Sequence, residues 1–261
     1  MNTKYSAKWD LLTLAVMPLT YFGASLRKVI MSKSRISVIC STYNSLPWID
    51  FYLDSLNEQS LKEFEVVFLD ASSTDDSLEK IKAYQFREGI SKKILEQPTR
   101  ISITESMNIG VKKASGEFIV IYSADDYLFP MALSTYEEYL TNHPTTDFIY
   151  SNFFVHESAS PYTITGIRIW PDHTHEALLK FCYCGPFPCI RKTSLIAAGD
   201  FNTKYLSSAD YDMWLRLSKN GAEFLKIKEV IGSFCFRQAS ASNQDLSAAQ
   251  AEDREIQSLN A

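Results

Sequence analysis

The sequence Phe118-Ile119-Val120-Ile121-Tyr122-Ser123-Ala124-Asp125-Asp126 determines how the rest of the chain is interpreted. Its first five residues are apolar and rich in β-branched side chains, which predicts a buried strand. The strand ends at two adjacent acids, and such a pair is able to hold a divalent cation against a phosphate-bearing ligand. An isolated Asp-Asp pair is more often a solvated turn, so the surrounding segments must decide between these interpretations.

The segments before this strand alternate between strand and helix patterns. Apolar runs predict strands at 35–40, 64–69 and near 94–95, and capped amphipathic segments predict helices at 45–59, from 77 onward and at 102–113. This alternation indicates an α/β fold with a mostly parallel sheet and helices on both faces. Ligands of such sheets bind at the carboxyl ends of the strands, so we expect Thr42, Asp70 and Asp125 to converge there.

The composition favours a globular protein with one full core. The chain has 261 residues, 46% of them hydrophobic, and a net charge of -5 without long basic runs. Binding to a nucleic-acid backbone needs clustered Lys and Arg, so no nucleic-acid partner is expected. The five cysteines are odd in number and fit no secreted disulfide framework, which indicates free thiols and a cytoplasmic location.

The chain is expected to have three parts. They are a helical extension at 1–30, a main domain at 31–240 with halves at 31–150 and 151–240, and a frayed helix or tail at 241–261. The uncharged run from Leu11 to Leu26 is shorter than the roughly 20 residues that a membrane-spanning helix needs. Nearby aromatic and basic residues suit a peripheral helix on the inner face of the cell membrane. A helix packed on the core, or the remnant of another module, fits equally well, and we expect deletion of residues 1–30 to leave a folded, active domain.

Four further motifs fall where the strand and helix pattern places loops and helix starts. They are Ser41-Thr42-Tyr43-Asn44, Asp70-Ala71-Ser72-Ser73-Thr74-Asp75-Asp76-Ser77, Asn108-Ile109-Gly110 with Ala114-Ser115-Gly116-Glu117-Phe118, and Ala209-Asp210-Tyr211-Asp212. In order and spacing they resemble the motifs of family 2 glycosyltransferases, from Arg35 to Arg237. The resemblance implies a GT-A fold, which is a Rossmann-like nucleotide-binding α/β fold with a smaller acceptor-side region. It also implies inverting transfer of a sugar from a nucleotide diphosphate to an acceptor hydroxyl.

The resemblance implies distinct roles for the acids. Asp125, with Asp126, would hold Mg²⁺ or Mn²⁺ under the departing diphosphate, because hard oxygen ligands favour these ions over zinc. Asp210 would be the general base that accepts the proton of the attacking hydroxyl. Asp212 is the fallback base, and its alternative role is a hydrogen bond to Arg216 one helical turn later.

A second set of residues would bind the donor. By resemblance, Asp70 contacts the base or ribose, Tyr43 packs on the base, and Ser41 or Thr42 hydrogen-bonds nearby. Asp75 either joins them or only caps the following turn, and Arg100 and Arg237 either reach a phosphate or lie on the surface. The complete set of donor-binding candidates is Ser41, Thr42, Tyr43, Asn44, Asp70, Asp75, Arg100, Asn108, Asp125 and Arg237.

Three positions depart from the family pattern. Ser41 stands where the family commonly has proline, Ser123 where the metal motif often has an acid or an amide, and Arg237 where a late histidine often binds the diphosphate. We therefore expect a modest metal affinity. His173 and His175 lie near three cysteines, but the spacing lacks the paired Cys-x-x-Cys of most zinc sites.

The leading hypothesis is a metal-dependent glycosyltransferase that uses a nucleotide sugar, with a UDP-sugar as the family's common donor. Its acceptor would be a glycan or a lipid-linked sugar in the assembly of a bacterial surface polysaccharide or related glycan. A nucleotidyltransferase is an alternative, although it would need a glycine-rich basic loop that residues 41–47 do not provide. A non-catalytic nucleotide-sugar-binding module is the other, and it would be indicated if Asp210 lay far from Asp125 and Asp126 or pointed into the core.

Overall fold

The computed structural model describes residues 35–157, 163–237 and 246–260. All of them belong to a compact unit that begins at Lys33. The predictions for residues 1–30 therefore lie outside the described residues. Within the described part of the chain, no helix is both long and apolar enough to span a bilayer.

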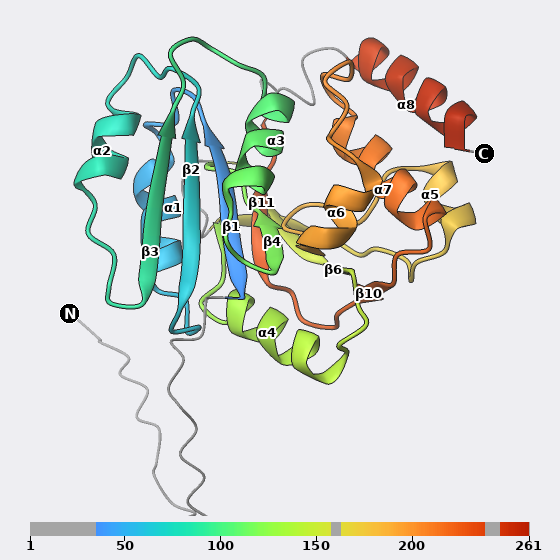
Figure 1. The fold of residues 1–261 in the computed structure, drawn as a ribbon, viewed down its shortest axis with the longest axis horizontal. Helices are drawn as coiled ribbons and strands as arrows, with labels where there is room; N and C mark the ends of the chain where they lie inside the picture. The colour runs from blue at the N-terminus through green and yellow to red at the C-terminus, as the bar shows by residue number, and fades with distance from the viewer. Residues whose placement is uncertain (1–34, 158–162, 238–245, 261) are drawn as a thin grey trace, which may run out of the picture. The chain divides into compact units, whose positions relative to one another are not determined.

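Strands and helices alternate over the first half of this unit, as the sequence predicts (Figure 1). The strands are β1 (Ile36–Thr42), β2 (Phe64–Asp70), β3 (Ile90–Glu96), β4 (Phe118–Ile121), β5 (Tyr127–Leu128), β6 (Phe148–Tyr150), β7 (Phe153–His156), β8 (Ile164–Arg168), β9 (Cys189–Arg191), β10 (Phe224–Lys226) and β11 (Gly232–Cys235). The helices are α1 (Ile49–Asn57), α2 (Ser77–Ala83), α3 (Ile103–Lys113), α4 (Ala132–Asn142), α5 (His175–Lys180), α6 (Lys192–Ala198), α7 (Ala209–Lys219) and α8 (Leu246–Asn260).

Seven strands form the main sheet, in the order β10-β6-β9-β4-β1-β2-β3. The neighbours of β1 run parallel to it, with Ile39 opposite Ile121 of β4 and Thr42 opposite Asp70 of β2. β9 runs antiparallel to both β4 and β6. The predicted α/β class with a mostly parallel sheet is confirmed, and the carboxyl ends of β1, β2 and β4 lie at one edge.

Both faces of the main sheet are covered, because side chains alternate along each strand. Val38 and Cys40 of β1 pack into a core with α1, α2 and α4. Ile39, between them, packs into a second core with α3 and with Trp214 of α7. The second core joins α7 to the sheet, so the late part of the chain is held beside the ends of β1 and β4 (Figure 1).

A smaller sheet, β5-β11-β7-β8, stands next to the main one. β5 begins directly after the acids at the end of β4, and β11 pairs with both β5 and β7. This pairing returns the chain near Arg237 to Asp125, although the two residues are far apart in sequence.

The segment expected as a frayed helix or tail contains the ordered helix α8. Ile256 on this helix is fully buried in the second core, and α8 packs against α5 and α7. The packing of α8 on the core is not predictable from its sequence, because one buried aliphatic residue in a polar segment does not form a detectable apolar stripe.

Candidate active site

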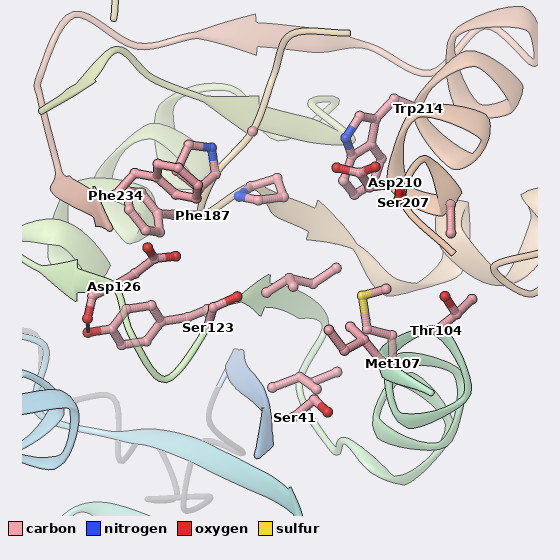
Figure 2. A pocket seen from close by; sticks show the side chains of 18 of the residues that line it. Ser41, Thr104, Met107, Ser123, Asp126, Phe187, Ser207, Asp210, Trp214 and Phe234 are labelled. Atoms are coloured by element: carbon pink, nitrogen blue, oxygen red, sulfur yellow. Dashed lines mark hydrogen bonds between the residues drawn. The ribbon is translucent and has the colours of Figure 1, made fainter. Parts of the chain in front are cut away.

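A pocket of about 230 Å³ opens at the carboxyl ends of β1 and β4 (Figure 2). Ser41 comes from β1, Ser123 and Asp126 come from the turn after β4, and Asp210 comes from the first turn of α7. Asp126 and Asp210 line this pocket from different walls (Figure 2). The structure therefore brings acids together that are distant in sequence.

The remaining wall of the pocket is mainly apolar. Phe187 and Phe234 lie on the side of Asp126, and Met107 and Trp214 lie on the side of Asp210 (Figure 2). Leu206, a residue that is 76% exposed, is among the lining residues before α7. An apolar wall around two acids strengthens their electrostatic interactions with anything bound there.

The turn that carries the paired acids is held by specific hydrogen bonds. The Tyr122 hydroxyl donates to the carbonyl of Asp126 at 3.0 Å and accepts from the Leu128 N–H at 3.1 Å. The Cys235 N–H donates to Asp126 Oδ1 at 2.9 Å. Burial of Asp126 and the neighbouring Asp125 charge raise the pKa of the Asp126 carboxyl well above its ordinary value.

Arg237 meets the acidic turn from the end of β11. Its guanidinium forms an ion pair with the Asp125 carboxylate and lies 4.3 Å from the centre of the Trp48 ring. Arg237 and Asp125 are donor-binding candidates from the sequence, whereas Trp48 is not among those candidates. No local signal marks this tryptophan, because its contact with Arg237 depends on the pairing of β11 in the smaller sheet.

The residues at the acidic turn fit a divalent cation of the magnesium type. Both acids would supply hard carboxylate oxygens, and a bound cation would favour the ionised form of Asp126 against the burial and the Asp125 charge that raise its pKa. Among the described residues, no group of three or more His, Cys, Asp or Glu side chains is gathered as a metal site. One or two carboxylates suffice for Mg²⁺ when phosphate oxygens of a substrate and water complete its coordination.

The histidines considered for zinc belong to a different network. His173 Nε2 and His175 Nδ1 lie 3.0 and 2.9 Å from the Ser218 hydroxyl. His173 also contacts the Tyr183 hydroxyl at 3.1 Å and stacks on Phe224. These contacts tie α5 and its preceding turn to α7.

Asp210 lies at the start of α7, where its side chain is partly buried. Its Oδ1 accepts the Tyr211 N–H at 2.8 Å. Burial raises the pKa of the Asp210 carboxyl to about 6, against the lowering effect of that hydrogen bond, and the nearby Asp253 carboxylate raises it further. A carboxylate with this pKa is a suitable general base near neutral pH.

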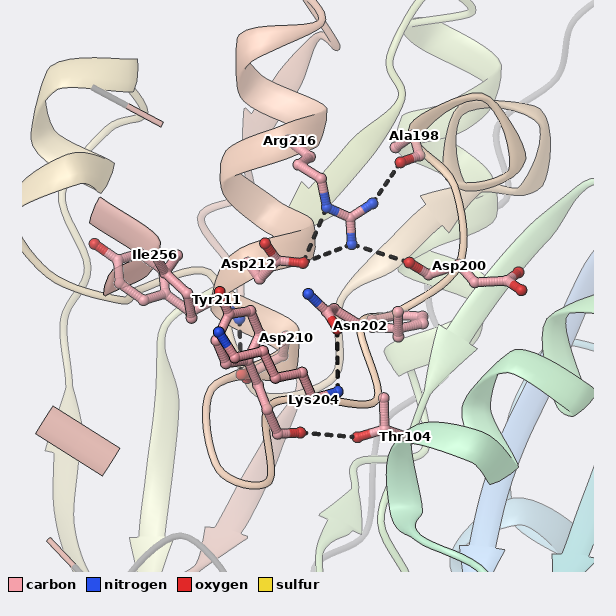
Figure 3. A network of polar contacts seen from close by, with 12 residues as sticks. Thr104, Ala198, Asp200, Asn202, Lys204, Asp210, Tyr211, Asp212, Arg216 and Ile256 are labelled. Atoms are coloured by element: carbon pink, nitrogen blue, oxygen red, sulfur yellow. Dashed lines mark hydrogen bonds and ion pairs between the residues drawn. The ribbon is translucent and has the colours of Figure 1, made fainter. Parts of the chain in front are cut away.

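Asp212 does not share the pocket with Asp210. Its Oδ2 accepts hydrogen bonds from Arg216 Nε at 2.9 Å and Nη2 at 2.7 Å, and Arg216 also donates to the carbonyls of Ala198 and Asp200 (Figure 3). The alternative role given to Asp212, a hydrogen bond to Arg216, is confirmed. This network connects α7 to the end of α6.

The first two loops of the sheet are joined to each other. Asp70 is buried, and its carboxylate accepts from the Ser73 N–H at 2.9 Å and from the Ser73 hydroxyl at 2.6 Å. The hydroxyl of Thr42 lies 3.4 Å from Asp70 Oδ1. Asn44 Oδ1 accepts from the Thr74 N–H at 2.8 Å. The structure thus brings Thr42, Asn44 and Asp70 together at the strand ends.

Asp75 acts within this loop as a cap. It accepts from the Ser77 N–H at 3.0 Å and from the Leu46 N–H at 3.2 Å, and it also binds the Ser77 hydroxyl. These hydrogen bonds lower the pKa of the Asp75 carboxyl, against the opposing effect of burial. Its oxygens hold the start of α2 against the loop before α1, which is the capping interpretation of the sequence.

Tyr43 and Arg100 lie together at the outer edge of these loops. The Arg100 guanidinium stacks 4.3 Å from the centre of the Tyr43 ring, and Tyr43 is 37% exposed. Both residues are exposed, so the outer side of this stacked pair is accessible to a nucleotide.

Asn108 does not line the pocket that holds Asp126 and Asp210, and its donor-binding role stays a prediction. Its amide donates to the Phe201 carbonyl at 2.9 Å and accepts the Phe201 N–H at 2.7 Å. Both ends of the amide therefore fasten α3 to the segment before α7. The sequence motif marks Asn108 as a candidate, but only the fold shows that its side-chain amide forms hydrogen bonds with the Phe201 backbone.

The chain belongs to glycosyl transferase family 2, because the model of that family matches residues 37–198, more than half of the chain. Among curated proteins, the amylovoran biosynthesis glycosyltransferase AmsB of Erwinia amylovora is 24% identical over 215 residues. These cover 78% of this chain and 70% of AmsB.

Solved structures share the fold. S. aureus TarS 1–349 in complex with UDP-GlcNAc matches with a TM-score of 0.71 and 22% identity, over 87% of this chain and 67% of TarS 1–349. The mannosyltransferase PcManGT of Pyrobaculum calidifontis, in complex with GDP-Man and Mn²⁺, gives a TM-score of 0.65 and 19% identity over 85% of this chain and 65% of PcManGT. Across the TarS 1–349 structures, the chain spans between 60% and 67% of the solved protein. The expected GT-A fold is confirmed.

Proposed function

We propose that this protein transfers a sugar, with inversion, from a nucleotide diphosphate donor to an acceptor hydroxyl. The observation that carries the proposal is the placement of Asp126 and Asp210 on different walls of one pocket (Figure 2). A direct displacement needs a group that stabilises the leaving diphosphate on one side of the sugar and a base on the other. A non-catalytic binding module has no need for this second acid.

The leaving group would depart toward the acidic turn. Asp125 and Asp126 are the residues that would hold Mg²⁺ or Mn²⁺, and such an ion neutralises negative charge on phosphate oxygens when it is bound. Arg237 lies against Asp125 and is supported by Trp48, so its guanidinium is able to donate to a phosphate from a fixed position. The mannosyltransferase that shares this fold was solved with GDP-Man and Mn²⁺.

The nucleoside would lie over the first two loops. Asp70 and Thr42 are buried at the strand ends, and Ser41 faces the pocket. Tyr43 with Arg100 offers an exposed stacked surface for a base. We propose a UDP-sugar as the donor, because the TarS structure that matches most of this chain contains UDP-GlcNAc.

The acceptor hydroxyl would lose its proton to Asp210 as it attacks the sugar. We propose a glycan or lipid-linked acceptor, since AmsB is named for the biosynthesis of the polysaccharide amylovoran. Assembly of a bacterial surface polysaccharide, at the cytoplasmic face of the membrane, is the process that fits this acceptor class.

A panel of nucleotide sugars tests the proposal. Each donor is incubated with Mn²⁺, Mg²⁺ or EDTA, and release of the nucleoside diphosphate is measured with and without a mixture of glycan acceptors. We expect release from one donor, dependent on the cation and enhanced by an acceptor. Release of inorganic pyrophosphate from a nucleoside triphosphate and a sugar phosphate would instead show a nucleotidyltransferase.

The pH dependence of the transfer rate should follow the ionisation of the Asp210 carboxyl. The base acts only when it is ionised, and its pKa is raised to about 6, so kcat/KM should rise with pH and level off above this value. The measurement is kcat/KM for the acceptor between pH 5 and pH 8, at saturating donor and cation. A rate that stays flat as pH falls through 6 would remove Asp210 from the role of base.

A further inference from the structure

The helix α8 (Leu246–Asn260) lies outside the segment that matches the family model, which ends at residue 198. It nevertheless touches the part of the chain that leads into the pocket. Ile256 anchors α8 in the core, and Gln257 Nε2 donates to the Tyr211 hydroxyl at 3.2 Å. The helix is therefore placed directly against the start of α7.

Glu252 on α8 binds three consecutive backbone amides. Its carboxylate accepts the N–H of Leu206 at 2.9 Å, of Ser207 at 3.0 Å and of Ser208 at 2.9 Å. Three N–H groups aimed at one carboxylate form a charge-assisted cradle, which fixes the backbone more firmly than single neutral hydrogen bonds would.

These three residues connect directly to the proposed base. α7 begins at Ala209, and Asp210 follows, so the segment held by Glu252 sets where the first turn of the helix starts. Leu206 and Ser207 also line the pocket with Asp210, and Ser207 lies next to Asp210 in Figure 2. Ser208 makes no side-chain cap for α7, because its hydroxyl donates to Asp253 at 2.6 Å. α8 thus holds the three residues that precede α7, through the amides of 206–208 and the Ser208 hydroxyl.

We propose that Glu252 is a positioning residue for sugar transfer, which holds segment 206–208 so that Asp210 faces the acceptor hydroxyl. The inference rests on the proposed function, since it assigns Asp210 to the acceptor side. Misplacement of a reacting group by about 1 Å is enough to cost on the order of a hundredfold in rate. Loss of Glu252 should therefore affect the acceptor step and leave donor binding unchanged.

The test compares Glu252→Gln with Glu255→Gln on the same helix. Glu255 binds the side chains of Lys204 and Tyr205 at an exposed position and does not bind the amides of 206–208, so it serves as a matched control. Glutamine at 252 offers one acceptor oxygen and turns an NH₂ group toward backbone donors. Amide hydrogen exchange of residues 206–208, donor affinity, and kcat and KM for the acceptor are measured for each protein.

We expect Glu252→Gln to accelerate exchange at 206–208 about tenfold and to lower kcat/KM for the acceptor about tenfold or more, with donor affinity unchanged. Glu255→Gln should change neither the exchange rate at 206–208 nor kcat/KM for the acceptor. Glu252→Asp, which keeps the charge but shortens the side chain, should repeat the loss and so show that position rather than charge is responsible.

Unchanged exchange in Glu252→Gln, or faster exchange with normal acceptor kinetics, would overturn the positioning role. An unmodified protein that transfers no sugar from any donor would overturn the proposed function instead. In that event the exchange data alone still decide whether Glu252 holds the segment before α7.

Discussion

Replacement of Asp210 by Asn is expected to lower the turnover number for sugar transfer by at least about a hundredfold, with donor affinity unchanged. The amide keeps the size of the side chain but cannot accept the proton of the acceptor hydroxyl. In the proposed function the donor is held by the acidic turn and the first two loops, which this substitution does not touch. The measurement pairs donor titration with acceptor-dependent release of the nucleoside diphosphate.

The same substitution should make the protein more stable at neutral pH. The ordinary pKa of 3.8 applies to Asp210 in the unfolded chain, and the folded chain raises it to about 6. Between these values the folded state binds more protons, so stability falls as pH rises from 4 to 6 and remains lower at pH 7. Asparagine removes a cost on the order of 2 kcal/mol, after allowance for partial exposure. A higher melting temperature at pH 7, with a difference that shrinks toward pH 4, would exclude unfolding as the cause of lost turnover.

Asp212→Asn is the matched control for this experiment. Asp212 lies on the same helix, but its carboxylate is used by Arg216 (Figure 3). Loss of this partly buried ion pair should cost about 2 kcal/mol of stability while turnover stays within about threefold. The opposite pattern, with normal turnover in Asp210→Asn and loss in Asp212→Asn, would transfer the base role to Asp212.

Much of the fold follows from local patterns in the sequence. The capping box between Ser102 and Glu105 starts α3 where the sequence predicts a helix, and the apolar run after Gly116 forms β4. These elements are visible because cap residues and apolar periodicity act over only a few residues. The convergence of the loops after β1 and β2 is also predictable, because parallel strands place their carboxyl ends at one edge of the sheet.

Contacts between distant segments could not be predicted in this way. The ion pair between Arg237 and Asp125 depends on the pairing of β11 with β5 and β7, and Trp48 joins it from the loop before α1. Local patterns also give no sign of the hydrogen bonds between Asn108 and the Phe201 backbone, or of those between Glu252 and the amides of 206–208. Polar side chains look the same in sequence whether they face a ligand or another part of the backbone.

Replacement of Asp125 by Ala is expected to lower cation-dependent turnover strongly, because it removes one of the two acids that would hold the ion and leaves only Asp126, which is buried. We expect a loss of at least about a hundredfold in turnover, together with weaker Mn²⁺ binding measured by electron paramagnetic resonance without donor. Asp172→Asn is the control, since Asp172 is an exposed acid that contacts Lys226 outside the pocket.

Arg237→Met gives the complementary result that makes this prediction specific. The Arg237 guanidinium forms an ion pair with the Asp125 carboxylate, so a cation would compete with this side chain for the same oxygens. Its removal should tighten Mn²⁺ binding about tenfold and weaken nucleoside diphosphate binding by a similar factor, because a phosphate partner is lost. Asp125→Ala and Arg237→Met should therefore move Mn²⁺ affinity in opposite directions. If Asp125→Ala leaves Mn²⁺ affinity and turnover as they are, the acidic turn is not where the cation acts, and charge on the departing diphosphate would have to be neutralised by other groups.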